Sequence, residues 1–343
     1  MNTEELSLIK RKIEENFYIY DLELHKDFIR FYVFPKFGRM SFEMLVRMFP
    51  EYKIDVGKSY DLFFIDVKKE RERIFLNVIL FLATIASTTL IGSTFYGKFD
   101  IVGGFIFSIA VMLVLGSHEM GHYLIARKWK MKTSLPYFIP FPTIIGTLGA
   151  VIKYKGIIPN RKALFDVGVA GPLAGVVASI FILYIGLRIP FNPEFSSGEI
   201  IILGDSVIFL VVAKLAGFES GRFMHPIAFA GWIGLFVTFI NLIPVGQLDG
   251  GHILRAMLGR RAEVVSKITP FLLITTGFLL KSQSRYFWIM WGLLTMFFSL
   301  QPHPGPADDE TPLDLKRYII GILTFCLGLA CFTPDFIRYS RLT

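Results

Sequence analysis

The chain has 343 residues, of which 53% are hydrophobic, with a mean hydropathy of +0.54 and a formal net charge of +8. Soluble domains carry about 45–50% apolar residues even when glycine is counted, and several apolar runs here approach the roughly 20 residues that cross a bilayer. The composition therefore excludes an ordinary soluble protein. The positive charge flanks the apolar runs, so it indicates membrane topology and not nucleic-acid binding.

Residues 1–72 are rich in charge and predict a small cytoplasmic α+β domain that precedes the first membrane span. Apolar periodicity favours helices over 4–15 and 41–52, and β-rich stretches occur at 17–23, 28–34 and 60–68. Two interpretations stay open for this domain. It binds a cytoplasmic regulator or substrate, or it is a stabilising appendage without a partner.

The first two expected spans, 74–96 and 101–126, agree on orientation. Basic residues at 68–73 precede the first span, and the basic flank 127–132 follows the second. By the positive-inside rule both flanks are cytoplasmic. We therefore expect a multi-pass protein of the cell (plasma) membrane with a cytoplasmic N-terminus.

The second span contains the motif HEMGH, in which His118 and His122 are one helical turn apart and share a face. Glu119 lies beside the first histidine, at the position of a general base. Ionisable residues in an apolar helix are costly unless they have a function. The motif predicts a site for one catalytic Zn²⁺ ion near the cytoplasmic end of the span. The alternative is a pair of core histidines beside a chance glutamate.

Residues 133–160 are apolar but interrupted by prolines and glycines, which disfavours a spanning helix. We expect a re-entrant loop with a short strand over 144–154, because irregular backbone at membrane depth needs a protein or cavity lining. The free edge of that strand would accept an extended peptide. The candidate substrate-binding residues in it are Gly146, Thr147, Leu148 and Gly149. The alternative is an interfacial loop with only a packing role.

Small residues in the third expected span, 163–187, predict close helix packing, and Asp166 is its one acidic residue. We expect the apolar part of 188–225 not to cross the membrane. If it crossed, Asp249, at the end of the fourth span (226–248), would face away from the histidines. Pro244 would open that span and free backbone groups for substrate.

The C-terminal region, 256–343, contains two short apolar runs at 268–280 and 286–300, and a last span at 318–334. Between them lies an acidic, proline-rich loop over 301–316. Three roles stay open for this loop: a plain connection, a gate or cap near the site, or a second metal site. The residues that would form that second site are His303, Asp308, Asp309 and Glu310.

The paired motifs HEMGH and NLIPVGQLDGG resemble those of the site-2 protease family of intramembrane zinc metalloproteases. Residues 146–150 and 170–175 strengthen the match, and the DDETPLD loop is similar to the archaeal and plant-chloroplast branch. The resemblance covers 74–255, so we expect a catalytic core over 73–255. The expected fold is mainly α and polytopic, with spanning helices, a re-entrant β-loop and the N-terminal α+β domain.

The resemblance implies that His118, His122 and Asp249 hold zinc, that Glu119 is the general base, and that Asn241 positions substrate or the oxyanion. It implies transmembrane protein substrates and regulated intramembrane proteolysis. The PDZ and CBS domains of some relatives are not expected here.

Three other functions stay open. The first is a membrane-anchored zinc protease that acts on soluble or loop peptides. The second is a non-catalytic membrane scaffold, which the intact motifs disfavour. The third is a transporter, which the lack of an inverted repeat disfavours. The sequence specifies neither the substrate nor the oligomeric state.

Overall fold

The computed structural model describes residues 3–36, 52–59, 62–69, 74–155, 158–193, 199–219, 221–301 and 305–341. The chain divides into two compact units. One comprises Met1–Ile74 with Lys130–Ser134 and Lys153–Ile157, and the other holds the remainder. The helix expected over 41–52 lies outside the described residues, except for Tyr52, which begins a strand.

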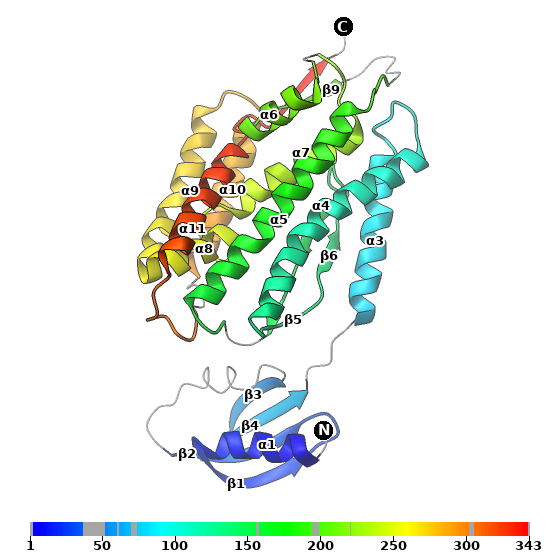
Figure 1. Ribbon diagram of the computed structural model, residues 1–343. Helices are drawn as coiled ribbons and strands as arrows, with labels where there is room; N and C mark the ends of the chain where they lie inside the picture. Colours follow the sequence, from blue (N-terminus) through cyan, green and yellow to red (C-terminus); the bar gives the residue numbers. More distant parts are fainter. Residues whose placement is uncertain are drawn as a thin grey trace. The chain divides into compact units, whose positions relative to one another are not determined.

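In the N-terminal unit, one helix packs on a four-stranded antiparallel sheet of order β1-β2-β4-β3 (Figure 1). The elements are α1 (Thr3–Glu14), β1 (Phe17–Leu24), β2 (Ile29–Pro35), β3 (Tyr52–Ser59) and β4 (Leu62–Lys69). Ile9 and Ile13 of α1 are buried against Phe31 and Ile65 of the sheet. The sequence analysis missed β3, because lysine, aspartate and glycine dilute its apolar alternation and pairing with β4 defines it.

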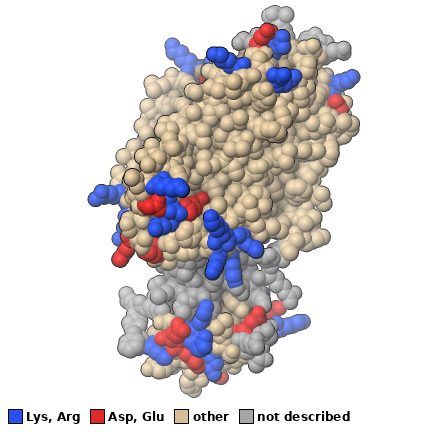
Figure 2. Space-filling view, in the orientation of Figure 1, with Lys and Arg blue, Asp and Glu red and all other residues tan. Residues whose placement is uncertain are grey.

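The second unit is a helical membrane fold. Its main helices are α3 (Ile74–Gly92), α4 (Ile101–Lys128), α5 (Arg161–Arg188), α7 (Pro226–Asn241), α8 (Asp249–Leu258), α9 (Ala262–Leu279), α10 (Ser284–Leu300) and α11 (Leu315–Ala330). Among the described residues, four segments are long and apolar enough to cross a membrane: Ile74–Gly92, Ile101–Lys128, Arg161–Arg188 and Asp249–Leu279. On the face shown in Figure 2, a broad band of uncharged surface lies over this unit, with charged side chains gathered towards its ends. The expected mainly α, polytopic membrane fold is confirmed.

The spans differ from expectation around Asp249. The helix expected over 226–248 ends at Asn241, and an irregular segment over 242–248 separates α7 from α8. Pro244 has no amide N–H, and tight backbone turns replace the helix there, with the N–H of Val245 donating to the carbonyl of Ile243 at 2.8 Å. The spanning segment that follows begins at Asp249, with a 3-10 turn, Gly259–Arg261, between α8 and α9.

Short two-stranded sheets and one short helix connect the spans. The region after α4 forms β5 (Lys132–Thr133) with β8 (Tyr154–Lys155), and β6 (Tyr137–Pro140) with β7 (Thr147–Val151). The strand expected over 144–154 is thus limited to β7 and the short β8. The region 188–225 contains β9 (Glu199–Leu203), which pairs with β10 (Ile337–Arg341), and α6 (Val207–Ala216). Sequence analysis missed β9 and β10, because each is defined by a partner far along the chain.

Helix α5 is the centre of the membrane unit and packs against α4, α7, α8 and α11 (Figure 1). Near its start, Asp166 accepts two hydrogen bonds of 2.8 Å from the guanidinium of Arg317 on α11. The indole of Trp129, which ends α4, also donates to Asp166, at 3.1 Å. Asp166 therefore ties three helices together at one end.

We expect Asp166→Asn to lower the free energy of unfolding by about 1–2 kcal/mol, because the bidentate pair of two charged groups becomes one hydrogen bond from Arg317 to a neutral amide oxygen. Thermal unfolding in detergent would measure the change. Glu219→Gln is the matched control, since Glu219 and its partner Arg222 are 72% and 64% exposed and such pairs contribute about 0–1 kcal/mol. Equal effects of the two substitutions would contradict this structural role.

Candidate metal centre

Three side chains from two helices meet at one point in the membrane unit. His118 and His122 come from α4, and Asp249 is the first residue of α8. The Nε2 atoms of the two histidines lie 3.2 Å apart. Each also approaches a different oxygen of Asp249, at 3.1 Å for His118 and 3.2 Å for His122. All three side chains are almost fully enclosed.

The hydrogen bond made by Nδ1 of His122 determines which tautomer of the ring is present, and so what its Nε2 atom presents to the site. Its Nδ1 lies 2.8 Å from the carbonyl oxygen of Val167 on α5. A carbonyl accepts only, so Nδ1 carries the proton, and in a neutral imidazole Nε2 is then a lone pair. That lone pair faces a carboxylate oxygen of Asp249. Two acceptors at this distance repel each other, and a cation between them removes the repulsion.

The separations of the donor atoms fit zinc. Ligands about 2.0–2.2 Å from a tetrahedral zinc ion lie about 3.3–3.6 Å from one another, close to the 3.2 Å between the two histidine nitrogens. One nitrogen of each histidine and one oxygen of Asp249 all lie within 4.8 Å of one another. Two imidazole nitrogens and one carboxylate oxygen are also ligand types that zinc accepts. Within the described part of the chain, these residues form the one group of histidine, cysteine and acidic side chains arranged to hold a metal ion.

Glycines allow α4 and α5 to approach closely enough for this arrangement. A Cβ atom on Gly171 of α5 would lie 2.0 Å from Nε2 of His122, and one on Gly121 of α4 would lie 2.5 Å from the carbonyl oxygen of Ala170. Contacts this short do not occur, so any larger residue would force the helices apart or displace the ring. The glycine face of α5 therefore forms one wall of the metal centre.

Two further candidate residues border the centre. Glu119 follows His118 on α4 and is buried, with 8% of its surface exposed. Asn241, the last residue of α7, places its amide nitrogen 3.4 Å from Nε2 of His118. The structure thus brings an amide donor from α7 to the donor cluster.

The candidate substrate-binding residues fall into two groups. Gly146 precedes β7, where the hydroxyl of Ser87 donates to its carbonyl at 2.7 Å. Thr147, Leu148 and Gly149 are in β7, which packs along α4 and pairs with β6. Among the described residues no other strand pairs with β7, and the Leu148 side chain is 59% exposed.

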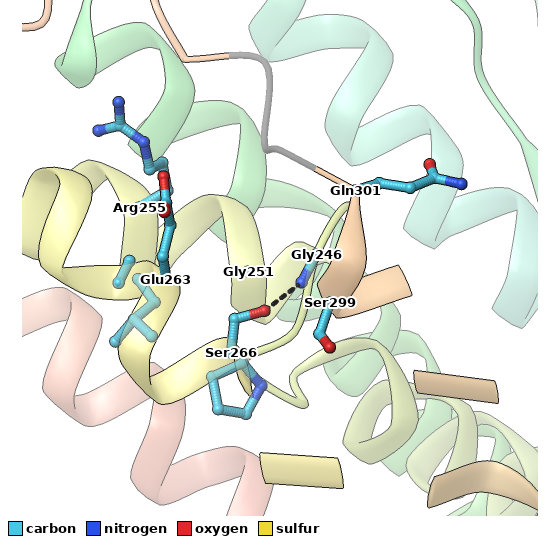
Figure 3. Close-up of a pocket in the computed structure, with 10 residues that line it drawn as sticks. Gly246, Gly251, Arg255, Glu263, Ser266, Ser299 and Gln301 are labelled. Carbon is cyan, nitrogen blue, oxygen red and sulfur yellow. Dashed lines mark hydrogen bonds between the residues drawn. The ribbon is translucent and has the colours of Figure 1, made fainter. Parts of the chain in front are cut away.

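Pro244, the fifth candidate substrate-binding residue, is not part of β7. It lies in the irregular segment before α8 and lines a cavity of about 30 Å³. Gly246, Arg255, Ser266 and Gln301 line the same cavity (Figure 3).

Sequence analysis missed Val167 and Gly171 as parts of the centre. Val167 acts through its backbone carbonyl, which every residue type possesses, so no sequence signal could have identified it. Gly171 lies in the AGPLAG segment that predicted close helix packing, but the sequence did not show that the packed partner is a histidine ring.

A polytopic helical membrane fold that encloses two histidines and an aspartate defines the class of this protein: it is a membrane protein with a buried group of side chains that could hold a metal ion. A family model described as "Peptidase family M50" matches residues 106–280. The chain belongs to this peptidase family, which the resemblance to site-2 proteases had anticipated.

Curated relatives of the chain include plant proteins. "Probable zinc metalloprotease EGY1, chloroplastic" from Oryza sativa subsp. japonica is 35% identical over 63% of this chain and 38% of its own length. The Arabidopsis thaliana EGY1 protein is 29% identical (62% and 40%), and "Probable zinc metalloprotease EGY2, chloroplastic" from Arabidopsis thaliana is 31% identical (66% and 41%). The chain spans about two fifths of the length of these relatives. No solved structure matches it.

We expect Gly171→Ala to weaken zinc binding by about 10–100-fold, the effect typical of lost outer contacts of a metal ligand, because the new methyl group displaces His122. Competition with a chromophoric chelator would measure the dissociation constant. Gly116→Ala on α4 is the control, since a Cβ there meets nothing within 4 Å. Unchanged zinc affinity in folded Gly171→Ala protein would refute the close approach.

Proposed function

We propose that this protein is a zinc metalloprotease that hydrolyses peptide bonds in or near the transmembrane segments of membrane proteins. Membership of peptidase family M50 supports the reaction class. The observation that carries the substrate class is the position of the donor cluster. Its histidines lie in the apolar helix Ile101–Lys128, which is long enough to cross a membrane, and its aspartate begins another such segment.

In this proposal His118, His122 and Asp249 hold one Zn²⁺ ion, and the carbonyl of Val167 keeps His122 in the tautomer that can bind it. Bound zinc supplies Lewis acidity, which acidifies water and polarises a peptide carbonyl. Glu119 accepts the proton of the attacking water and delivers it to the leaving amine. Asn241 donates its amide N–H to the oxygen on which negative charge develops.

A helical substrate must unwind before cleavage, because its carbonyl groups are engaged in hydrogen bonds. We propose that the free edge of β7 holds the unwound segment extended by strand addition. The exposed Leu148 and the contact of β7 with α4, the helix that carries the histidines, support this role. We propose that Pro244 contributes by ending the helix before Asp249, which leaves an irregular segment that can contact the substrate.

We further propose that the centre faces the cytoplasmic side of the cell membrane. Arg127 and Lys128 end α4, one to two turns after His122, and basic residues mark cytoplasmic flanks. The N-terminal unit would then lie in the cytoplasm, where it binds a regulator or substrate. The chloroplast location named for the plant relatives describes those proteins.

We expect Glu119→Gln to reduce cleavage of a transmembrane substrate in liposomes by about 10²–10⁴-fold, the usual contribution of a general base. Zinc content should be unchanged, because Glu119 is not among the proposed ligands. Cleavage would be followed by gel analysis and zinc by atomic absorption. Glu219→Gln, an exposed carboxylate, is the control for activity. Full hydrolysis by Glu119→Gln would show that the mechanism is wrong.

The role of β7 predicts a specific cross-link. In a background without Cys326 and Cys331, Leu148→Cys combined with Glu119→Gln should form a disulfide with a cysteine next to the scissile bond of the substrate. Leu113→Cys is the matched control, since Leu113 is 53% exposed on α4 but lies outside the proposed strand. Equal cross-linking at both positions would count against strand addition.

A further inference from the structure

Helix α8 carries a buried ion pair in addition to Asp249. The Nη1 and Nη2 atoms of Arg255 donate to the two carboxylate oxygens of Asp309, at 2.8 and 2.7 Å. Arg255 is 8% exposed and Asp309 is 30% exposed. These hydrogen bonds hold the pKa of Asp309 below its ordinary value, so the pair stays charged at neutral pH.

Asp309 belongs to the acidic loop before α11, and this loop is fixed to the start of α5. The N–H groups of Ala307 and Asp308 donate to the carbonyls of Ile158 and Pro159, at 2.9 and 3.0 Å. Asp308 uses its carboxylate within the loop, where it accepts from Thr311 and from the N–H of Glu310. Asp308 therefore serves the structure of the loop, and Asp309 serves Arg255.

The end of α8 is held to the same two regions. The guanidinium of Arg161 on α5 donates to the carbonyls of Ala256 and Met257, both at 2.8 Å, and the hydroxyl of Tyr318 on α11 donates to Met257 at 2.9 Å. These bonds satisfy carbonyls that have no partner inside the helix. The far end of α8 is thus anchored to α5 and α11.

The start of α8, which carries Asp249, has less direct support. Among the described side chains none caps this helix N-terminus. The preceding irregular segment makes backbone turns of its own, and the N–H of Gly246 donates to the hydroxyl of Ser266 on α9, at 3.0 Å (Figure 3). The orientation of Asp249 therefore depends on how the rest of α8 is held.

Helix geometry explains how the ion pair can affect the position of Asp249 without touching it. Arg255 follows Asp249 by about 9 Å along the axis and projects about 120° around the helix from it, at 1.5 Å and 100° per residue. A tether on that second face resists both rotation and sliding of α8. Either movement would carry the Asp249 carboxylate away from the two imidazoles.

We infer that the Arg255–Asp309 ion pair is a positioning device for the metal centre, in which the acidic loop holds α8 so that Asp249 faces His118 and His122. This inference rests on the proposed function, in which Asp249 is a zinc ligand. Arg255 and Asp309 are positioning residues, since neither touches the donor atoms.

The experiment compares full-length Asp309→Asn, Arg255→Gln and the double variant in detergent. We expect each single substitution to weaken zinc binding by about tenfold, at the lower end of outer-contact effects. The double variant should be no weaker than the weaker single variant, because both remove the same tether. Co²⁺ substitution gives a second measurement, since its visible absorption bands depend on coordination geometry and should change in the single variants.

Two further variants of the chain complete the comparison, a control and a conservative substitution. Glu310→Gln changes an exposed neighbouring carboxylate and should keep wild-type zinc affinity and Co²⁺ bands. Asp309→Glu keeps the charge but lengthens the arm, so its bands should shift while the unfolding temperature stays near that of the wild type. This variant tests the inference even if Asp309→Asn does not fold.

Asp249→Ala separates the inference from the proposed function. If Asp249→Ala loses zinc while Asp309→Asn, Arg255→Gln and Asp309→Glu bind it with wild-type affinity and bands, the positioning role is overturned and the proposed function stands. Additive losses in the double variant would also overturn it. If Asp249→Ala keeps zinc, the proposed function fails and the inference fails with it.

Discussion

The hydrogen bond between His122 and the backbone carbonyl of Val167 is the interaction on which the candidate metal centre depends. In the neutral ring it places the proton on Nδ1, and so leaves a lone pair directed at Asp249. This arrangement is unfavourable in an apolar interior without a cation. The bond exists only because α4 and α5 touch at Gly121 and Gly171, so helix packing and metal chemistry have a common origin.

The irregular segment between α7 and α8 has a similar double role. A continuous helix through Pro244 would lack backbone hydrogen bonds within the membrane, where each unpaired polar group is costly. The break resolves this problem with tight turns and with Ser266. It also begins a new helix at Asp249, which turns the carboxylate towards the histidines. The remaining positional freedom of α8 is limited by its anchors to α5, α11 and the acidic loop.

The sequence predicted the components of this site well and the structure around them less well. The spacing of His118 and His122 was sufficient to place both rings on one helix face, and charge flanks with topological parity brought Asp249 to the same end. The predicted helix and three strands of the N-terminal unit within the described residues agree with α1, β1, β2 and β4. Strands β3, β9 and β10 were missed, because pairing and not local pattern defines them.

The structure gives some residues a role that the sequence alone did not indicate. Asp166 was an isolated acid in an apolar run, and the structure pairs it with Arg317 and Trp129. The acidic loop had three open roles, and in the structure its Asp309 is paired with Arg255 of α8. His303 lies outside the described residues.

By itself the sequence determined the membrane class, the two-histidine helix face and the identity of the aspartate that could join it. The first two follow from hydropathy and helical periodicity, which act over a few turns, and the third is what the resemblance of the NLIPVGQLDGG motif implies. Only the tertiary structure decided that the Val167 carbonyl orients His122, that Gly171 packs on its ring and that Arg255 is paired with Asp309. These are contacts between helices, and they depend on distances that no local pattern encodes.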